Sequence, residues 1–594
     1  MQSSHMEPES QRIAAAVGRG AAATRLHFAV WIGCALLLLF AALTVCMRRP
    51  WDPDELRYAQ ITTAMKEDGT LFKPRLWGEE YLEKPPIFFW FVMAFGFVLG
   101  DVGLAALVAP AVISACVGLW LAAWIGLRWW GDRAAMFVAG VLVTLPLYLL
   151  CTTLGRMDMP FAVAITFATW WFYRGYVEGR RWSKLSAFAA VGVAIVIKGP
   201  LGVLFPLGTL VAFLALTGRL RRLMVWETLA GFALSLAVLG VWLVPAMIEL
   251  GPGYLTRLIV RHVVVAAVDG KDHPKSMFFY MPAVPLLWLP WTVFAPAALW
   301  AAWQRWRSER SERDLWLLCW IVVPLVLLTV VRQKMYIYLL PTMLPFAVLM
   351  GRYWFCLTAA PDGAGQLRWP AAALRLGGVL GGVLFAAGGW LVQTETVAVL
   401  RGELDPILTS LTAPHVLFVA GGVLLAMSLV GWIRSNRAAP RDVRFTFGGV
   451  MAASIGSFLV LYLVVYPALD DCQSWWPVAR AIQARQNPGE PIVAYQLNPY
   501  VGYYFHEPVV ACKKPAALCR LLADHESVLC VVPSDKLVEV AECAVATFDR
   551  KVRPPSPKGP VYIVRLRRPE ADHESDEPAR IARGAAREES KSHP

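Results

Sequence analysis

Long apolar runs recur along almost the whole chain and are separated by short polar stretches. Fourteen of these runs approach the length of about 20 residues that a helix needs to cross a bilayer. The run at 86–100 is short for a span and rich in Phe and Trp, which suits a helix lying in the headgroup zone. A crossing there would also put the basic clusters from Arg128 onward on the wrong side of the membrane. Without it, the pattern predicts a polytopic helical membrane protein with thirteen spans.

The basic loops decide how these spans are oriented. We place the spans at residues 26–46, 103–127, 134–151, 160–176, 185–197, 200–217, 226–249, 283–304, 314–331, 337–357, 372–393, 415–433 and 447–466. Lys and Arg favour the cytoplasmic side of a membrane, and this assignment puts every basic cluster between the spans on that side. An odd number of spans then puts everything after Tyr466 on the external side.

Several polar stretches that are far apart in the sequence converge on the external face in this arrangement. They are 47–102, 152–159, 198–200, 250–282 and 332–338. Polar groups that gather at one end of an apolar bundle would suit a lipid-linked substrate, whose tail needs an apolar environment and whose headgroup needs polar contacts.

Composition narrows the class of protein. The chain of 594 residues is 57% hydrophobic and 17% charged, with a mean hydropathy of +0.51, which excludes an ordinary soluble protein. The net charge of +13 lies in short loops, which fits anionic lipid headgroups better than nucleic acid, and no nucleic-acid-binding signature is present. The sequence contains no C-x-x-C pair, which would be a signature of a metal site. Disulfides are an open alternative among five C-terminal cysteines: Cys472, Cys512, Cys519, Cys530 and Cys543.

The chain divides into four parts by composition. Residues 1–25, with a tag-like opening, form a cytoplasmic N-terminus; 26–466 form the membrane domain; 467–567 form a small periplasmic α/β domain; and 568–594 form a disordered tail. Within the third part we predict helices at 475–486, 515–523 and 535–543, and strands at 491–496, 528–532 and 561–566.

The first external loop carries the densest candidate chemistry. In DPDELRYAQ, the carboxylates Asp54 and Glu55 are candidates for a general base or a sugar contact, and Arg57 and Tyr58 for phosphate contacts. In the later LEKPP, two prolines restrict where the Lys84 ammonium can reach, which suits a phosphate anchor. The alternatives are a solvated loop with ordinary surface charges and a lysine that contacts lipid headgroups.

Two more charged residues interrupt apolar sequence. Asp158 in GRMDMP is costly at a membrane unless it is paired or faces water. Its alternative role is an ion pair with Arg156 or an N-cap of the following helix. Lys198 in AIVIKGPLG is a candidate for the external cavity, and its alternative is a lysine that reaches the membrane interface.

The 250–282 segment and the start of the tenth span supply weaker candidates. Arg257 and Arg261 would share one face of a helix, which either closes over an anionic ligand or lies on phospholipid. Glu83 of LEKPP is a substrate-binding candidate. Together with His262 it is also a weak metal candidate, because nothing in the spacing requires a divalent ion. The remaining substrate-binding candidates, which are also common interfacial residues, are Lys334, Tyr336 and Tyr338.

Taken together, DPDELRYAQ, LEKPP, RMDMP, KGP, DHPKSMFFYMP followed by LPW, and RQKMYIYLLPTMLP resemble motifs of the GT-C-fold polyprenyl-phosphate-sugar glycosyltransferases. This superfamily includes the protein O-mannosyltransferases, and the motifs are most similar to those of the bacterial 4-amino-4-deoxy-L-arabinose lipid A transferases. The resemblance implies that Asp54 is the principal catalytic-loop carboxylate and Asp158 the second. It also implies that Arg57, Tyr58 and Lys84 lie near the carrier phosphate.

The function that this resemblance implies is an inverting transfer of the aminosugar from undecaprenyl phosphate to a lipid A phosphate. We expect the reaction at the periplasmic face of the bacterial inner membrane, by a monomer that requires no cofactor, with resistance to polymyxin as its consequence. One alternative is sugar transfer to protein Ser/Thr or to another glycan. A transporter or flippase is a third, although it predicts charges at mid-membrane rather than at one side.

Overall fold

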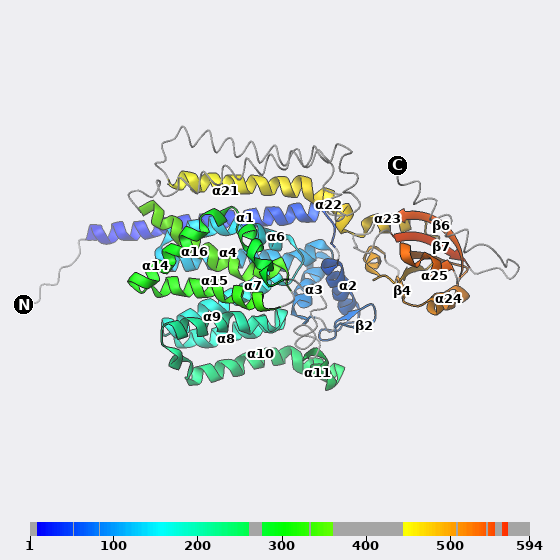
Figure 1. Ribbon diagram of the computed structural model, residues 1–594, viewed down its shortest axis with the longest axis horizontal. Coiled ribbons are helices and arrows are strands. Elements are labelled where there is room, and N and C mark those ends of the chain that lie inside the picture. Colours follow the sequence, from blue (N-terminus) through cyan, green and yellow to red (C-terminus); the bar gives the residue numbers. More distant parts are fainter. Residues whose placement is uncertain are drawn as a thin grey trace, which may run out of the picture.

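The computed structural model describes residues 9–51, 53–81, 84–259, 276–331, 334–359, 443–505, 509–541, 544–552 and 561–567. Most of the long helices run side by side in one bundle, and a small domain with a β-sheet lies beyond one end of it (Figure 1). A polytopic helical fold with a C-terminal α/β domain was predicted, and the structure confirms this fold class.

The bundle is built from helices that overlap the expected spans, although 134–151 and 283–304 are each divided into two helices. In chain order they are α1 (Glu9–Met47), α4 (Leu104–Trp130), α5 (Asp132–Val143), α6 (Pro146–Thr153), α7 (Asp158–Phe172), α8 (Arg181–Lys198), α9 (Leu201–Leu216), α10 (Trp226–Leu250), α13 (Tyr280–Leu287), α14 (Ala295–Glu309), α15 (Glu312–Val330), α16 (Met343–Ala359) and α21 (Val443–Val460). In the described part of the chain, six helices are long and apolar enough to cross a membrane, or seven with one bent pair. The total of thirteen spans stays a prediction, and two of them, 372–393 and 415–433, lie outside the described residues.

The bent pair is α5 and α6, whose axes differ by 65°. Pro146 stands in the first turn of α6, where its ring and its missing N–H prevent α5 from continuing. Thr144 occupies the break and donates its hydroxyl to the backbone oxygen of Gly140, 2.7 Å away. The bend directs α6 toward the turn that contains Arg156 and Asp158.

The first external loop folds into two helices and a hairpin. α2 (Asp54–Glu67) was not predicted, whereas α3 (Ile87–Leu99) confirms a helix in the aromatic run 86–100. Between them, β1 (Arg75–Leu76) and β2 (Glu79–Glu80) form an antiparallel hairpin. Tyr58 of α2 is buried against Phe88 and Phe89 of α3, with ring centroids 5.6 Å apart in both pairs, so α3 covers α2.

The C-terminal domain contains a mixed five-stranded sheet in the order β4-β3-β5-β7-β6. Its strands are β3 (Ile492–Tyr495), β4 (Val510–Cys512), β5 (Ser527–Pro533), β6 (Val545–Val552) and β7 (Val561–Arg567). The helices are α23 (Trp476–Gln483), α24 (Pro515–Asp524) and α25 (Leu537–Ala541), and α22 (Tyr466–Gln473) joins the domain to the bundle. The sheet begins parallel at β4-β3-β5 and ends antiparallel at β5-β7-β6.

Candidate active site

Two carboxylates from distant parts of the chain meet through one guanidinium group. Asp54 is the first residue of α2, Asp158 is the first residue of α7, and Arg156 lies in the turn before α7. Arg156 pairs with Asp54, and its Nε donates to Oδ2 of Asp158 over 3.1 Å. Asp54 also accepts from Nη2 of Arg57, which is 2.6 Å away on the next turn of α2. The expected convergence of the 47–102 and 152–159 stretches is therefore observed.

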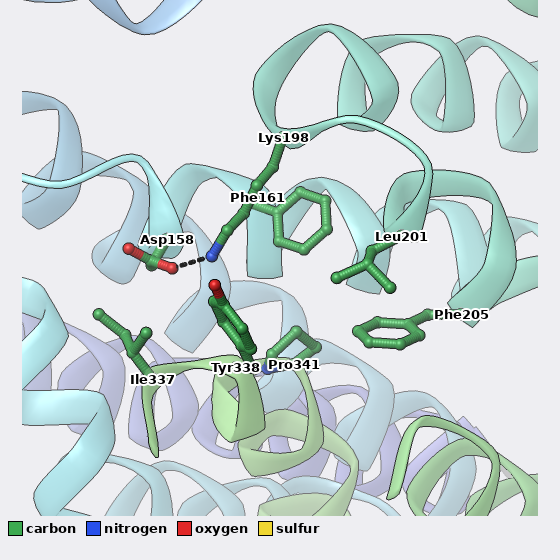
Figure 2. A pocket seen from close by; sticks show the side chains of 8 residues that line it. All are labelled: Asp158, Phe161, Lys198, Leu201, Phe205, Ile337, Tyr338 and Pro341. Atoms are coloured by element: carbon green, nitrogen blue, oxygen red, sulfur yellow. Dashed lines mark hydrogen bonds and ion pairs between the residues drawn. The ribbon is translucent and has the colours of Figure 1, made fainter. Parts of the chain in front are cut away.

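Lys198 extends this centre toward a pocket. Lys198 is the last residue of α8, which ends because Gly199 adopts a φ of +86° that L-residues rarely tolerate. Its ammonium pairs with Asp158 and lies 4.5 Å from the ring centroid of Tyr338 (Figure 2). The residues that line the pocket are Asp158, Lys198, Tyr338, Phe161, Leu201, Phe205, Ile337 and Pro341. Charged groups thus lie at one side of an otherwise apolar pocket.

Electrostatics keep Asp158 ionised and Tyr58 neutral. Burial alone would raise the pKa of Asp158, but the Lys198 ammonium and the Arg156 guanidinium outweigh it and lower the pKa to about 2. Burial, reinforced by the Asp54 carboxylate, raises the pKa of the Tyr58 phenol well above its ordinary value. Asp158 is therefore an anion bound to two cations, and Tyr58 is a buried neutral phenol.

Glu55 has surroundings that differ from those of its neighbour Asp54. Its carboxylate accepts from Nη1 and Nη2 of Arg48 at 2.5 and 2.8 Å and from two backbone N–H groups, of Trp51 at 2.8 Å and Gly155 at 2.7 Å. Gly155 has no room for a side chain, because a Cβ there would lie 2.7 Å from Cβ of Leu107. Glu55 therefore ties the start of α2 to the turn that carries Arg156.

The other predicted residues are distributed around this centre. Arg257, in α11 (Gly253–Ile259), pairs with Glu80 of the hairpin at 3.3 Å rather than with Asp54 or Asp158. Lys334 is buried and donates to the backbone oxygen of Val331, and Tyr336 is exposed and packs on Phe279 at 4.6 Å. Lys84 is half-buried just before α3. The residues that lie outside the described part are Glu83, Arg261 and His262.

Three residues of this network were not among the predicted site residues. Arg156 was considered only as an ion-pair partner of Asp158, and Arg48 and Asp470 were not considered. Asp470 in α22 accepts from the backbone N–H of Arg49 at 2.8 Å and from Nε1 of Trp51 at 3.2 Å. A sequence signal existed for Arg48, because an arginine directly after an apolar span and before two carboxylates needs a partner if it is buried.

Within the described residues, no cluster of metal ligands occurs and three of the C-terminal cysteines are free thiols. No group of three or more His, Cys, Asp or Glu side chains that could hold a metal ion occurs there. Cys512, Cys519 and Cys530 are free thiols. The other two C-terminal cysteines, Cys472 and Cys543, have no described side chains. The question of a metal at Glu83 and His262 thus falls outside the described part of the chain.

Sequence comparisons give a consistent set of relatives. A family model described as dolichyl-phosphate-mannose-protein mannosyltransferase matches residues 83–245. The undecaprenyl phosphate-alpha-4-amino-4-deoxy-L-arabinose arabinosyl transferase of Aeromonas salmonicida is 28% identical over 54% of this chain and 59% of its own length. The undecaprenyl phosphate-alpha-4-amino-4-deoxy-L-arabinose arabinosyl transferase 2 of Sodalis glossinidius is 26% identical over 67% of this chain and 72% of its own length. The chain thus spans less than two thirds of the length of the Aeromonas relative.

Solved structures give the fold. ArnT from Cupriavidus metallidurans bound to undecaprenyl phosphate superposes with a TM-score of 0.73 and 19% identity, covering 90% of this chain and 97% of the other. The apo state of the same protein gives a TM-score of 0.71 and 21% identity over the same shares. The chain has the GT-C fold. The resemblance found in the motifs is confirmed by the family model and the sequence relatives. The Asp54–Arg156–Asp158–Lys198 chain of ion pairs lies in this bundle.

Proposed function

We propose that this chain is a glycosyltransferase that moves 4-amino-4-deoxy-L-arabinose from undecaprenyl phosphate to a phosphate of lipid A. The observation that carries the proposal is the chain of ion pairs Asp54–Arg156–Asp158–Lys198 at one end of an apolar bundle. It joins three of the motifs that resemble those of GT-C glycosyltransferases. The names of the sequence relatives support the choice of donor and sugar.

The carrier phosphate would be held by cations around the mouth of the site. Lys198 next to Tyr338 supplies positive charge and a polar group in a pocket with apolar walls, and Arg57 and Lys84 are the further candidate cations. Such an arrangement binds an anionic headgroup while a polyprenyl tail remains among apolar side chains. The cations would also stabilise the negative charge that develops on the departing undecaprenyl phosphate.

The transfer needs one bond to form and one to break. An oxygen of the acceptor phosphate attacks the anomeric carbon of the sugar, and the bond between that carbon and the carrier phosphate oxygen breaks. The electron pair leaves with undecaprenyl phosphate, and attack from the opposite side inverts the anomeric configuration. Because a phosphate monoester is already largely anionic near neutral pH, Asp54 has at most one proton to accept and would mainly orient the donor.

The carboxylates of the candidate site would favour a donor whose sugar carries an amino group. Protonated 4-amino-4-deoxy-L-arabinose carries a cation, which carboxylates attract. Asp54 is the candidate partner, because its side chain is 15% exposed, whereas that of Glu55 is 3% exposed and surrounded by four donors. The sugar ammonium would replace one of the two guanidinium groups that Asp54 now contacts. Glu55 would therefore act as a positioning residue and not as a second catalytic carboxylate.

Transfer to a protein hydroxyl is the second candidate, favoured by the description of the family model that matches residues 83–245. A Ser or Thr acceptor must lose its proton to a base. Asp54 is engaged by both Arg57 and Arg156, so it would have to release a guanidinium group before it could act as that base. This geometry favours an acceptor that is already anionic. The pairing of Asp158, Lys198 and Arg156 at helix ends also argues against a transporter.

We place the protein in the bacterial inner membrane, with the site and the C-terminal domain on the periplasmic side, and we expect it to act as a monomer without a required metal. The turn between α14 and α15 lies at the end of the bundle far from the C-terminal domain (Figure 1). Arg305, Arg307, Arg310 and Arg313 surround it, which is the charge expected of a cytoplasmic turn.

The experiment is mass spectrometry of lipid A from cells with the gene, without it, and with Asp54→Asn. We expect lipid A that carries the aminosugar only with the wild-type gene, together with a loss of polymyxin resistance in the other two strains. Full modification by Asp54→Asn would contradict the role of Asp54. Unmodified lipid A together with newly glycosylated membrane proteins would favour the second candidate instead.

A further inference from the structure

The hairpin between α2 and α3 contains an unfavourable residue at its tip. Its register pairs Arg75 with Glu80 and Leu76 with Glu79, so the turn consists of Trp77 and Gly78 alone. Both have positive φ, +54° and +82°, as a two-residue type I′ turn requires. Asn, Asp or Gly favours the first of these positions, whereas a bulky Trp there costs free energy. Something else must favour Trp77.

Trp77 bridges α2 and the C-terminal domain. Its Nε1 donates to Oε1 of Gln60 in α2 at 3.1 Å, and Nε2 of the same glutamine donates to the backbone oxygen of Pro499 at 3.1 Å. The indole also packs edge-on against Tyr500 of the 3₁₀ helix η10 (Tyr500–Tyr504), with centroids 5.3 Å apart. One side chain at the hairpin tip therefore contacts both elements.

The same side of α2 is buried by the C-terminal domain. Leu56, one turn before Gln60, is fully buried in a cluster with Trp475, Val478 and Val501. Tyr500 is itself 7% exposed and lies in that cluster. Arg57, which pairs with Asp54, is the next residue after Leu56. The surface that receives the C-terminal domain thus lies on the helix that carries Asp54 and Arg57.

We propose that Trp77 is a positioning residue that fixes the C-terminal domain to α2, through Gln60, Pro499 and Tyr500, and thereby holds Asp54 and Arg57 in place for the transfer. This inference gives the C-terminal domain a part in the reaction, and it rests on the proposed function for its kinetic consequence. The unfavourable turn is retained because the indole makes this contact.

The test uses substitutions that separate the turn from the contact. Trp77→Gly removes the indole and suits the turn, so it should not lower the thermal stability of the hairpin itself. Trp77→Phe keeps a ring for Tyr500 but loses the donor for Gln60. Leu71→Ala, at an apolar residue of the same loop that is 46% exposed, is the matched control. Each is made in the full-length protein.

Two measurements are made on each variant: amide hydrogen exchange of segments 54–60 and 500–504, and kinetics with an undecaprenyl-phosphate aminosugar donor and lipid A. For Trp77→Gly we expect faster exchange in both segments and a fall in kcat of about tenfold with little change in the KM for the donor. Trp77→Phe should lie between it and the wild type, and Leu71→Ala should match the wild type.

The outcomes are distinguishable. Unchanged exchange in Trp77→Gly would overturn the contact itself. Faster exchange with an unchanged kcat would overturn the positioning role. A wild-type protein that shows no transfer would refute the proposed function, and the exchange measurement would still decide whether Trp77 fixes the C-terminal domain to α2.

Discussion

Asp54 and Glu55 are consecutive carboxylates with opposite surroundings. The Glu55 side chain is 3% exposed and its partner Arg48 is fully buried, so each charge depends on the other for compensation. Asp54 is 15% exposed and is contacted by two arginines at the edge of the site. Neighbouring residues of one type can therefore serve structure and chemistry separately, according to what surrounds them.

Replacing each of these carboxylates should separate the two roles. Glu55→Gln leaves the buried Arg48 without a compensating charge, and breaking such a pair costs about 3 kcal/mol or more. We expect a clearly lower Tm of the detergent-solubilised protein for Glu55→Gln, whereas Asp54→Asn should lose transfer activity at a nearly unchanged Tm. Glu79→Gln, at a residue whose side chain is 80% exposed, is the control. Equal Tm values for Glu55→Gln and the wild type would contradict the structural role of Glu55.

The depressed pKa of Asp158 predicts a pH dependence. Because the pKa falls from 3.8 to about 2 on folding, the ion pairs of Asp158 stabilise the protein fully above about pH 4 and lose their effect as the pH falls toward 2. The difference in Tm between wild type and Asp158→Asn should stay constant between about pH 5 and 8 and shrink below about pH 4. A difference that stays constant down to about pH 2 would show that folding does not lower the pKa of Asp158.

At the scale of elements, α3 matters because it closes over α2. Phe89 is fully buried and contacts both Tyr58 and Tyr81, whereas Phe91 on the same helix is 44% exposed. Phe89→Ala should lower stability by about 3–5 kcal/mol, as a large-to-small substitution in a core does. Phe91→Ala should have little effect. Thermal unfolding of both variants in the same detergent measures this, and similar Tm values for the two would contradict the packing of α3 on α2.

The sequence predicted the central strands of the C-terminal domain and missed its edges. The expected strands at 491–496, 528–532 and 561–566 correspond to β3, β5 and β7, whose buried residues form apolar runs. β4 and β6 are the two edge strands. β4 is three residues long, and β6 contains the charged residues Asp549, Arg550 and Lys551, so neither has the apolar pattern that identifies a strand.

The sequence predicted which candidate residues lie at the same end of the bundle. It did not predict which side chains pair with one another there. Orienting the spans by their basic loops brought Asp54, Asp158 and Lys198 to one face, where the structure also has them. The helix α2 was missed because the loop was interpreted by its charges, although Asp54 and Glu55 in a first turn and Lys66 in a last turn favour a helix. The contacts of Glu55 with Gly155 link residues 100 apart, which no local pattern encodes.

At the scale of the whole molecule, the two ends of the bundle differ in kind. The C-terminal domain and α2, whose Asp54 belongs to the candidate site, lie at one end of the bundle, and the basic turn between α14 and α15 lies at the other (Figure 1). If the basic end faces the cytoplasm, Cys519 of α24, which is an exposed free thiol, must lie outside. A membrane-impermeant maleimide should therefore label Cys519 in spheroplasts.

The reciprocal label comes from the opposite end. In a Cys519→Ser background, Arg310→Cys should be labelled only after the membrane is made permeable, because Arg310 is exposed in the turn between α14 and α15. The background variant alone corrects for the remaining cysteines, of which Cys46 and Cys356 are also exposed. Labelling of Arg310→Cys in intact spheroplasts would place the basic end outside. The Asp54–Asp158 centre would then face the cytoplasm, and a transfer reaction at the periplasmic face would be excluded.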